Sequence, residues 1–179
     1  MPMSHKAYAF NWRVFERDEL PGLLSRALET RDTAGLLAYV ERNRQALKDP
    51  YEGNALAENW QDLLENQDVH EYGDFALTRF YDPNADSGLG YCWNELDDAL
   101  PEEDREVLLG SPFGPRHNRF DPGRYGSYFQ TPRQVAGTLA RFRGLDLSWL
   151  EEHDQVFARG FEGLLEECVA GGLGLYVTF

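Results

Sequence analysis

The sequence lacks the patterns by which several classes of protein are recognised. No apolar stretch approaches the roughly 18–20 residues that a membrane-spanning helix needs. The opening MPMSHKAYAF has no basic flank followed by an apolar run of secretion-signal length. Cysteine occurs only at Cys92 and Cys168, without a CxxC unit, so we expect reduced thiols and no disulfide framework. These absences predict a cytoplasmic protein with no membrane partner.

Catalytic and metal-binding signatures are also scarce. The four histidines form neither an HxxxH nor an HExxH zinc pattern, and they are scattered along the chain: His5, His70, His117 and His153. Cys168 lies on the apolar face of a predicted helix, where we expect a buried, inert thiol. We therefore predict no catalytic residue, no metal site and no cofactor, and a binding protein rather than an enzyme.

Basic residues are nearly missing from the middle of the chain. Residues 49–104 contain sixteen acidic residues and one basic residue, Arg79, and the net charge of the whole chain is −14. Such a charge distribution repels the phosphates of DNA and RNA over most of the surface, so we expect no nucleic-acid partner. It favours a basic protein as the partner instead.

The acidic segment 49–104 supports two interpretations. It is either a solvated surface that keeps the protein soluble, or a protein-interaction module that binds a basic partner, as an immunity protein binds a cationic toxin. We prefer the second, because carboxylates that face a cationic partner raise the association rate. The candidate partner-binding side chains are five acids: Asp62, Glu65, Asp68, Glu71 and Asp74.

Positive charge is concentrated in a segment rich in turns. Residues 111–126, SPFGPRHNRFDPGRYG, contain three prolines and three glycines and predict a long ordered loop, a kind of loop that is often functional. Guanidinium groups bind planar anions through two parallel hydrogen bonds. Five side chains of this loop are candidates for holding a phosphate or carboxylate: Arg116, His117, Arg119, Arg124 and Tyr125.

Two interpretations of these loop arginines stay open. The charge balance favours pairing with the protein's own acidic segment. Alternatively, the loop covers a pocket, and the protein is a small-molecule-binding domain or a minor enzyme that holds an anionic ligand. A structure in which all the guanidiniums are paired with carboxylates, with no cavity beneath them, would exclude the alternative.

Periodicity and turn signals predict a mainly helical fold. We expect strands at 4–10 and 173–179, and a further strand at 90–93 or 126–130. Two capping boxes, which begin at Thr131 and Ser148, mark the starts of the last two helices. The other helices are expected at 21–31, from 32 or 33 to before Pro50, 54–64, 68–81 and 101–110. The prediction is one α+β domain, residues 1–179, with six to seven helices around a small sheet that contains the N- and C-terminal strands.

The segment DPNADSG, residues 82–88, invites comparison with a calcium loop. Asp82, Asn84 and Asp86 stand where the first three ligands of such a loop would stand. However, Ser87 occupies the position that needs glycine, and Trp93 occupies the position of the bidentate glutamate. We therefore interpret the segment as a turn that stops a helix, with Gly88 supplying a positive φ.

Three features resemble one family. They are the YFQTPRQVAGTLARF helix start, the DLSWLEE start of the last helix and the terminal GGLGLYVTF strand. In order and spacing they are similar to the C-terminal half of YfbM-like bacterial proteins of unknown function and their actinobacterial relatives, and the opening MSHKAYAF strand fits the same relatives. The resemblance covers roughly the last seventy residues and the first ten. It implies a small α+β fold and a stand-alone bacterial protein, with no established activity and no catalytic residues.

Overall fold

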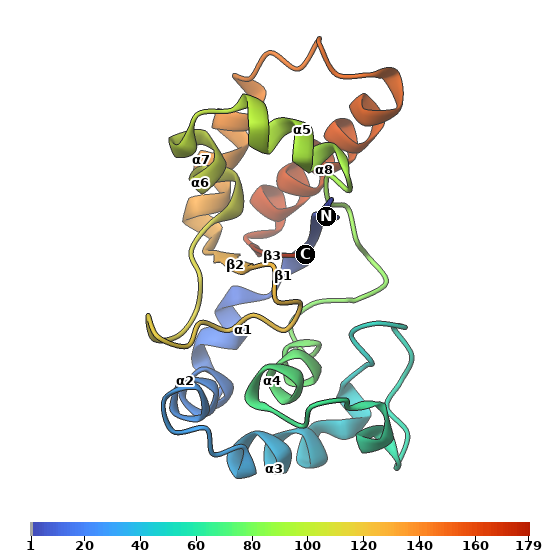
Figure 1. Ribbon diagram of the computed structural model, residues 1–179, viewed down its shortest axis with the longest axis vertical. Coiled ribbons are helices and arrows are strands. Elements are labelled where there is room, and N and C mark those ends of the chain that lie inside the picture. The colour runs from blue at the N-terminus through green and yellow to red at the C-terminus, as the bar shows by residue number, and fades with distance from the viewer. Residues whose placement is uncertain (1) are drawn as a thin grey trace.

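The structure of the protein, a computed structural model, describes residues 2–179. Within this range the chain forms eight α-helices and one three-stranded sheet (Figure 1), which confirms the predicted α+β, mainly helical fold. In chain order the elements are β1 (Lys6–Phe10), α1 (Trp12–Arg17), α2 (Leu20–Thr30), α3 (Ala34–Asn43), α4 (Val69–Leu77), α5 (Cys92–Ala99), α6 (Glu102–Leu109), β2 (Ser127–Gln130), α7 (Pro132–Arg143), α8 (Glu152–Gly171) and β3 (Gly174–Thr178). Two short 3-10 turns lie at Arg44–Ala46 and Trp60–Leu63.

The sheet has the strand order β1-β3-β2, and both pairings are antiparallel. The N- and C-terminal strands are therefore neighbours, as predicted. On the central strand, Tyr176 lies opposite Tyr8 on one side and opposite Phe129 on the other. Of the two candidate segments for the further strand, 126–130 is right and 90–93 is wrong, because Cys92 and Trp93 begin helix α5.

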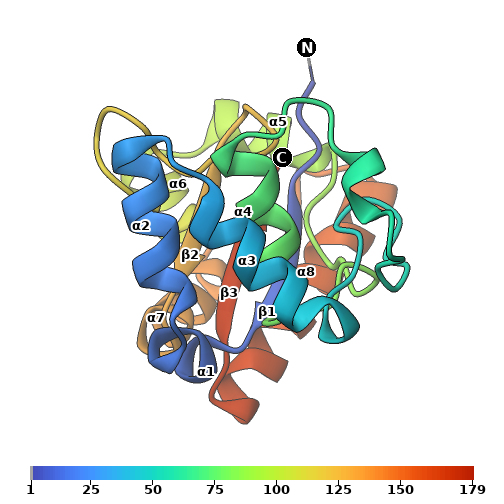
Figure 2. The same cartoon turned by 90° about the horizontal axis from the view of Figure 1, so that it is seen from below.

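The two faces of the sheet carry two different hydrophobic cores. Along β1, Tyr8 and Phe10 belong to the cluster formed with α1–α4, whereas Ala7 and Ala9 pack with the cluster formed by α5–α8. This is the period-two alternation of a strand that is covered on both faces. Figures 1 and 2 show the result, a sheet between one layer of N-terminal helices and one layer of C-terminal helices.

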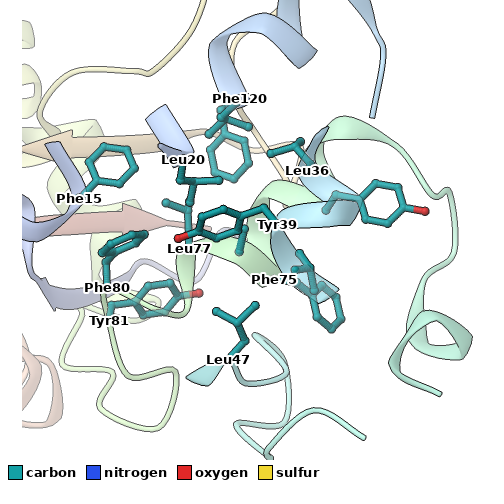
Figure 3. Packing of buried hydrophobic residues seen from close by; sticks show 14 of the residues in the cluster. Phe15, Leu20, Leu36, Tyr39, Leu47, Phe75, Leu77, Phe80, Tyr81 and Phe120 are labelled. Carbon is teal, nitrogen blue, oxygen red and sulfur yellow. The ribbon is translucent and has the colours of Figure 1, made fainter. Parts of the chain in front are cut away.

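The N-terminal layer is rich in aromatic side chains, and it also receives one residue of the 111–126 loop. Phe15, Phe75 and Phe80 come from α1 and from the α4 region, and Phe120 comes from the loop; all four are buried in one cluster (Figure 3). Burying a phenylalanine side chain contributes about 1.5–3 kcal/mol. Phe120 therefore anchors the centre of the arginine-rich loop onto the N-terminal helices, of which α4 belongs to the acidic segment.

The C-terminal layer contains both cysteines. Cys92 and Cys168 are free and buried, as expected for inert thiols. Burial raises the pKa of Cys92 to about 11 and that of Cys168 to about 12. Because the thiolate is the reactive form, neither side chain is suited to nucleophilic chemistry at neutral pH.

The two predicted capping boxes have different outcomes. At α7 the box is confirmed: the backbone N–H of Gln134 donates to Thr131 Oγ1 at 3.3 Å, and the Gln134 side chain accepts from the N–H of Thr131 at 2.8 Å. At the last helix the prediction is wrong, since α8 begins at Glu152. The hydroxyl of Ser148 instead donates to Asp146 Oδ1 at 2.7 Å, which closes a local turn before the helix.

The segment 54–64 departs most from its predicted helix. Only the short turn Trp60–Leu63 is helical, and it is of the 3-10 type. The indole of Trp60 is buried, and its N–H donates to Glu41 on α3 at 2.9 Å. This long-range anchor outweighs the weak helical pattern. Two short helices, α1 and α5, were not predicted, although the side chain of Asn11 caps α1 by accepting from the N–H of Val14.

Candidate functional site

A cleft of about 750 Å³ brings together the two candidate sites that the sequence suggested separately. One wall is built from Tyr51 and from residues 63–71 of the acidic segment, and the other from residues 119–124 of the arginine-rich loop. Of the predicted residues, the cleft is lined by Glu65, Asp68, Glu71, Arg119 and Arg124. Asp62, Asp74, Arg116, His117 and Tyr125 lie outside its lining.

His70, a cleft-lining residue that was not among the predicted site residues, joins the two walls. Its Nδ1 accepts a hydrogen bond from the backbone N–H of Asp121 at 3.1 Å, and its ring stacks against Phe120 with the centroids 6.2 Å apart. An imidazole that accepts at Nδ1 carries its proton at Nε2. His70 therefore contributes an N–H donor that makes no hydrogen bond within residues 2–179.

The start of α4 uses two of the five predicted partner-binding acids for its own structure. Asp68 is the N-cap and accepts from the backbone N–H groups of His70 and Glu71, both at 3.0 Å. The buried carboxylate of Glu71 accepts three backbone N–H groups, from Glu65 at 2.9 Å, Asn66 at 2.8 Å and Gln67 at 2.6 Å. Most of the hydrogen-bonding capacity of these two carboxylates is therefore already satisfied.

Asp74 is buried rather than presented to a partner. Its residue is 6% exposed, and its carboxyl group forms no hydrogen bond or ion pair within residues 2–179. Burial raises the pKa of Asp74 to about 7, with a smaller opposing effect from Lys6. Of the five predicted acids, only Asp62 and Glu65 are exposed at the surface, because Asp68 is partly covered and Glu71 is buried.

The arginine-rich loop is held in place without carboxylate partners for its arginines. No guanidinium among Arg116, Arg119 and Arg124 forms an ion pair with a carboxylate of residues 2–179, although Arg119 donates to the carbonyl of Gly114. His117 faces Glu29 on α2 at 3.4 Å. Together with the cavity, this arrangement leaves the ligand-binding interpretation of the loop open.

Backbone contacts and one carboxylate shape the loop instead. Asp121 accepts from the N–H of Gly126 at 2.9 Å, and the side-chain amide of Asn118 donates to the carbonyl of Leu28 at 2.8 Å. Arg124 has φ 65°, in the left-handed region that non-glycine residues rarely adopt. This strained backbone places an exposed guanidinium on the lining of the cleft. Strain of this kind is concentrated at functional sites.

Side chains of both charges line the cleft. Arg119, Arg124 and the Nε2 N–H of His70 retain free donor groups on this lining. Although Tyr51 as a residue is 63% exposed, desolvation of its hydroxyl raises the pKa of this group to about 12, and Asp74, Glu71, Glu65 and Asp49 act in the same direction. Because its arginines have no carboxylate partners within residues 2–179, the cleft can hold an anion.

A second cavity, of about 900 Å³, lies between α6, α7 and β2. Its buried polar groups are already satisfied: Gln130 donates to the carbonyls of Val107 and Leu108, and accepts from the hydroxyl of Thr138 at 2.6 Å. Arg141, on its rim, is paired with Asp104. This cavity offers fewer unused charged groups to a ligand than the cleft between α4 and the 111–126 loop.

The 82–88 segment forms a turn, and its three candidate ligands have separate roles. Asp82 pairs with Lys48 at 2.8 Å, Asn84 donates to the carbonyl of Gly53 at 3.1 Å, and Asp86 accepts from the N–H of Ala7 at 3.0 Å. Gly88 does not have the expected positive φ. Glycine is required there because a Cβ would collide with the backbone of His5 and Lys6.

Within residues 2–179, no group of three or more His, Cys, Asp or Glu side chains is placed to hold a metal ion. In the same part of the chain, no helix combines the length and the apolar character that crossing a bilayer requires.

Comparisons of this chain with protein families, with curated proteins and with solved structures found no match. The resemblance to YfbM-like proteins, and the bacterial origin that it implies, therefore stay predictions.

Proposed function

We propose that the protein binds a small anionic ligand in the cleft between the start of α4 and the 111–126 loop. The observation that carries this proposal is the absence of carboxylate partners for Arg119 and Arg124, both of which line the cleft. A guanidinium group can hold a carboxylate or phosphate through two parallel hydrogen bonds. The Nε2 N–H of His70, which also lines the cleft, adds a third donor.

The state of the carboxylates in the cleft supports the same proposal. Asp68, Glu71 and Asp121 are bound to backbone N–H groups, which spread and partly neutralise their charge. The arginine side chains have no comparable compensation. An incoming anion therefore meets donors that folding has left unused, and the cost of desolvating it is offset by charge-assisted hydrogen bonds.

The test is a calorimetric titration with inorganic phosphate and, separately, with acetate at low ionic strength. We expect saturable binding that Arg124→Gln weakens at least about tenfold, which corresponds to the loss of roughly 1.4 kcal/mol. Arg116→Gln is the matched control, because Arg116 belongs to the same loop but does not line the cleft. Absence of binding to the wild-type protein, or equal losses in the two variants, would contradict the proposal.

A second candidate function is the binding of a basic protein, in the manner of an immunity protein. The specific observation in its favour is an exposed apolar pair, Tyr51 at 63% and Leu63 at 51%, beside the exposed acids Asp62 and Glu65. Aromatic and apolar anchors inside a charged rim are typical of protein interfaces. The site is smaller than the five acids of the sequence prediction, since Asp74 is buried and Glu71 is bound internally.

A salt titration tests this second function. A captured basic partner should bind much more weakly as the ionic strength rises, because its association would be driven by charge. The double variant Asp62→Asn, Glu65→Gln should slow association, and Glu102→Gln with Glu106→Gln, on the distant helix α6, serves as the control of equal charge change. An affinity for the basic partner that does not change with ionic strength would exclude this function.

A further inference from the structure

A further cavity, of about 480 Å³, lies between residues 86–91 and the first half of α8. Three large hydrophobic side chains that solvent reaches line it: Tyr91 is 66% exposed, Val156 56% and Phe157 46%. Val156 and Phe157 lie four and three residues before Gly160, which also lines the cavity, so these residues share one face of α8. This part of the C-terminal layer (Figure 1) therefore presents an apolar helix face that the rest of residues 2–179 leaves uncovered.

Glycines give this cavity its depth. Gly90 has φ 58°, and a Cβ there would approach the ring of Phe157 to 3.3 Å, so the ring lies directly against the backbone. Around Gly160 no atom lies within 4 Å of the place where a Cβ would stand. Glycine inside a helix costs about 1 kcal/mol relative to alanine, and internal packing does not require it here. The space above Gly160 is therefore open to a side chain from another molecule.

The charged side chains on the lining of this cavity are acidic. Asp86 and Asp154 belong to the lining, and no lysine or arginine does. The carboxylate of Asp86 accepts two backbone N–H groups, at 2.9 and 3.0 Å. Asp154, 6% exposed, faces Nε2 of His153 at 3.3 Å, and an imidazole balances a carboxylate only in its protonated form. Negative charge therefore accompanies the exposed apolar side chains.

An apolar cavity with acids on its lining is complementary to a basic, apolar segment of chain. We propose that this surface docks a segment of a basic partner protein, in which one large apolar side chain enters the space above Gly160 and neighbouring lysines or arginines face Asp86 and Asp154. The surface shares no lining residue with the anion-binding cleft, so the proposal is independent of the proposed function. It also differs from the surface around Tyr51 and Leu63, neither of which lines this cavity.

Charge decides between the possible occupants of this surface. A second copy of the chain would bring its own net charge of −14, and a symmetric contact would place the same acids opposite one another. An anionic bilayer surface or a nucleic acid would be repelled for the same reason. A basic protein is attracted over a distance, which raises its association rate.

The apolar side chains would supply most of the affinity. Contact with Tyr91, Val156 and Phe157 removes exposed apolar surface from water, and exposed apolar patches beside polar residues are typical of interaction sites. Aromatic anchors are common among the residues that contribute most to binding. A lysine or arginine of the partner can also lie over the ring of Tyr91, where a cation–π contact adds to its attraction by the carboxylates.

The experiment is a selection of peptides from a random dodecapeptide library displayed on phage, with the whole 179-residue chain as the target. Synthetic copies of the selected peptides are then titrated by fluorescence anisotropy. We expect the peptides to share a Phe, Leu or Trp flanked by Lys or Arg. Replacing the apolar residue by Ser, or the basic residues by Gln, should weaken binding at least about tenfold, and raising the ionic strength should weaken it as well.

A matched pair of glycine substitutions assigns the binding site. Gly160→Leu fills the cavity and should weaken the selected peptides at least about tenfold. Gly163→Leu is the control, because Gly163 is also a glycine of α8 with open space around it but does not line the cavity. Both substitutions place a better helix former in α8, so neither should prevent folding, and thermal denaturation checks this.

A second pair of variants tests the role of charge. Asp154→Asn should weaken the basic peptides at least about threefold and should reduce the effect of salt on their affinity. Glu167→Gln is its control, since Glu167 is an exposed acid of the same helix outside the lining.

Each other outcome overturns the inference. It is wrong if no peptide is selected, if the selected peptides lack basic residues, or if Gly160→Leu and Gly163→Leu bind them equally. It is also wrong if the protein is a dimer that Gly160→Leu dissociates, because the face is then covered by a second copy. Peptides that lose affinity in the Asp62→Asn, Glu65→Gln variant but not in Gly160→Leu would place the basic partner on the acidic segment instead. The phosphate titration tests the anion site separately.

Discussion

The imidazole of His70 accepts the backbone N–H of Asp121 at 3.1 Å, although the two residues are 51 positions apart in the sequence. This hydrogen bond fastens the arginine-rich loop to helix α4. It also fixes the tautomer in which the proton of His70 is at Nε2. One side chain therefore sets the position of one wall of the cleft and adds an N–H donor to its lining.

Substitutions of His70 should separate these two roles. His70→Ala removes the acceptor for Asp121, and we expect a loss of about 1–2 kcal/mol in stability and faster amide exchange in residues 119–124. His70→Asn places an amide oxygen near the Nδ1 position, so it should restore slow exchange but not anion binding. Amide hydrogen exchange and phosphate titration measure the two effects. Equally fast exchange in the Asn and Ala variants would contradict the anchoring role.

Glu71 should be important for stability, and Glu65 should not. Glu71→Ala leaves the N–H groups of Glu65, Asn66 and Gln67 without their acceptor, and we expect the free energy of unfolding to fall by about 2–4 kcal/mol. Glu65→Ala is the matched control, because its exposed side chain makes no hydrogen bond within residues 2–179 and should change stability by less than about 0.5 kcal/mol. Urea denaturation of both variants provides the comparison, and similar losses would show that the carboxylate of Glu71 is not a structural acceptor.

The parts of the fold that local patterns control were predictable from the sequence. The alternation in residues 4–10 gave strand β1, and the Thr131 capping box gave the start of α7. The segment 54–64 was mispredicted because a distant contact decides its conformation: Trp60 is held by Glu41 on α3. Helix α5 was missed for a related reason, since the run GYCW looks equally suited to a strand.

The candidate site was predictable only as two separate halves. Composition drew attention to the acidic segment and to the arginine-rich loop, and residues from both line the cleft. Two contacts bring the acidic segment and the arginine-rich loop together. They are the packing of Phe120 among the N-terminal helices and the hydrogen bond between His70 and Asp121. Neither contact has a local sequence signal. The burial of Asp74 was equally hidden, because its position relative to the sheet follows from the packing of α4.

Glycine substitutions should have opposite effects at two positions. A Cβ at Gly123 would meet the carbonyl oxygen of Phe179 well inside contact distance, so Gly123→Ala should destabilise the loop by at least about 1 kcal/mol and weaken anion binding. Gly163 lies within α8 with open space around it, and Gly163→Ala should stabilise the protein by about 0.5–1 kcal/mol. Thermal denaturation measures both changes. A neutral Gly123→Ala variant would show that the loop does not depend on this close approach.

Two buried groups should give stability opposite dependences on pH. Asp74 has its pKa raised to about 7 by burial, and His5 has its pKa lowered to about 3, also by burial. The Nδ1 atom of His5 accepts from the N–H of Leu89 at 3.1 Å, and its ring stacks on Trp93. The neutral ring therefore has its proton at Nε2, which is buried without a partner, and protonation would add a second proton at Nδ1, where it would break the hydrogen bond from Leu89.

The signs follow from the number of protons that each state binds. Between about pH 4 and 6.5 the folded protein holds a proton on Asp74 that the unfolded chain releases, so this group makes stability fall as pH rises. Over the same range the unfolded chain holds a proton on His5 that the folded protein excludes, so this group makes stability rise with pH. Each contributes a slope of about 1.4 kcal/mol per pH unit, and in the wild-type protein the two nearly cancel.

Removing either Asp74 or His5 should leave the pH dependence of the free energy of unfolding that the other group causes. In Asp74→Asn, the free energy of unfolding should rise relative to wild type by about 2 kcal/mol between pH 4.5 and 6. In His5→Asn, which keeps an acceptor for the N–H of Leu89, it should fall by a similar amount over the same range, and the double variant should follow the wild-type curve. Urea denaturation at four pH values between 4.5 and 8 measures these differences. If Asp74→Asn runs parallel to wild type, the carboxyl group of Asp74 is ionised in the folded protein at pH 6, and its burial does not hold a proton on it.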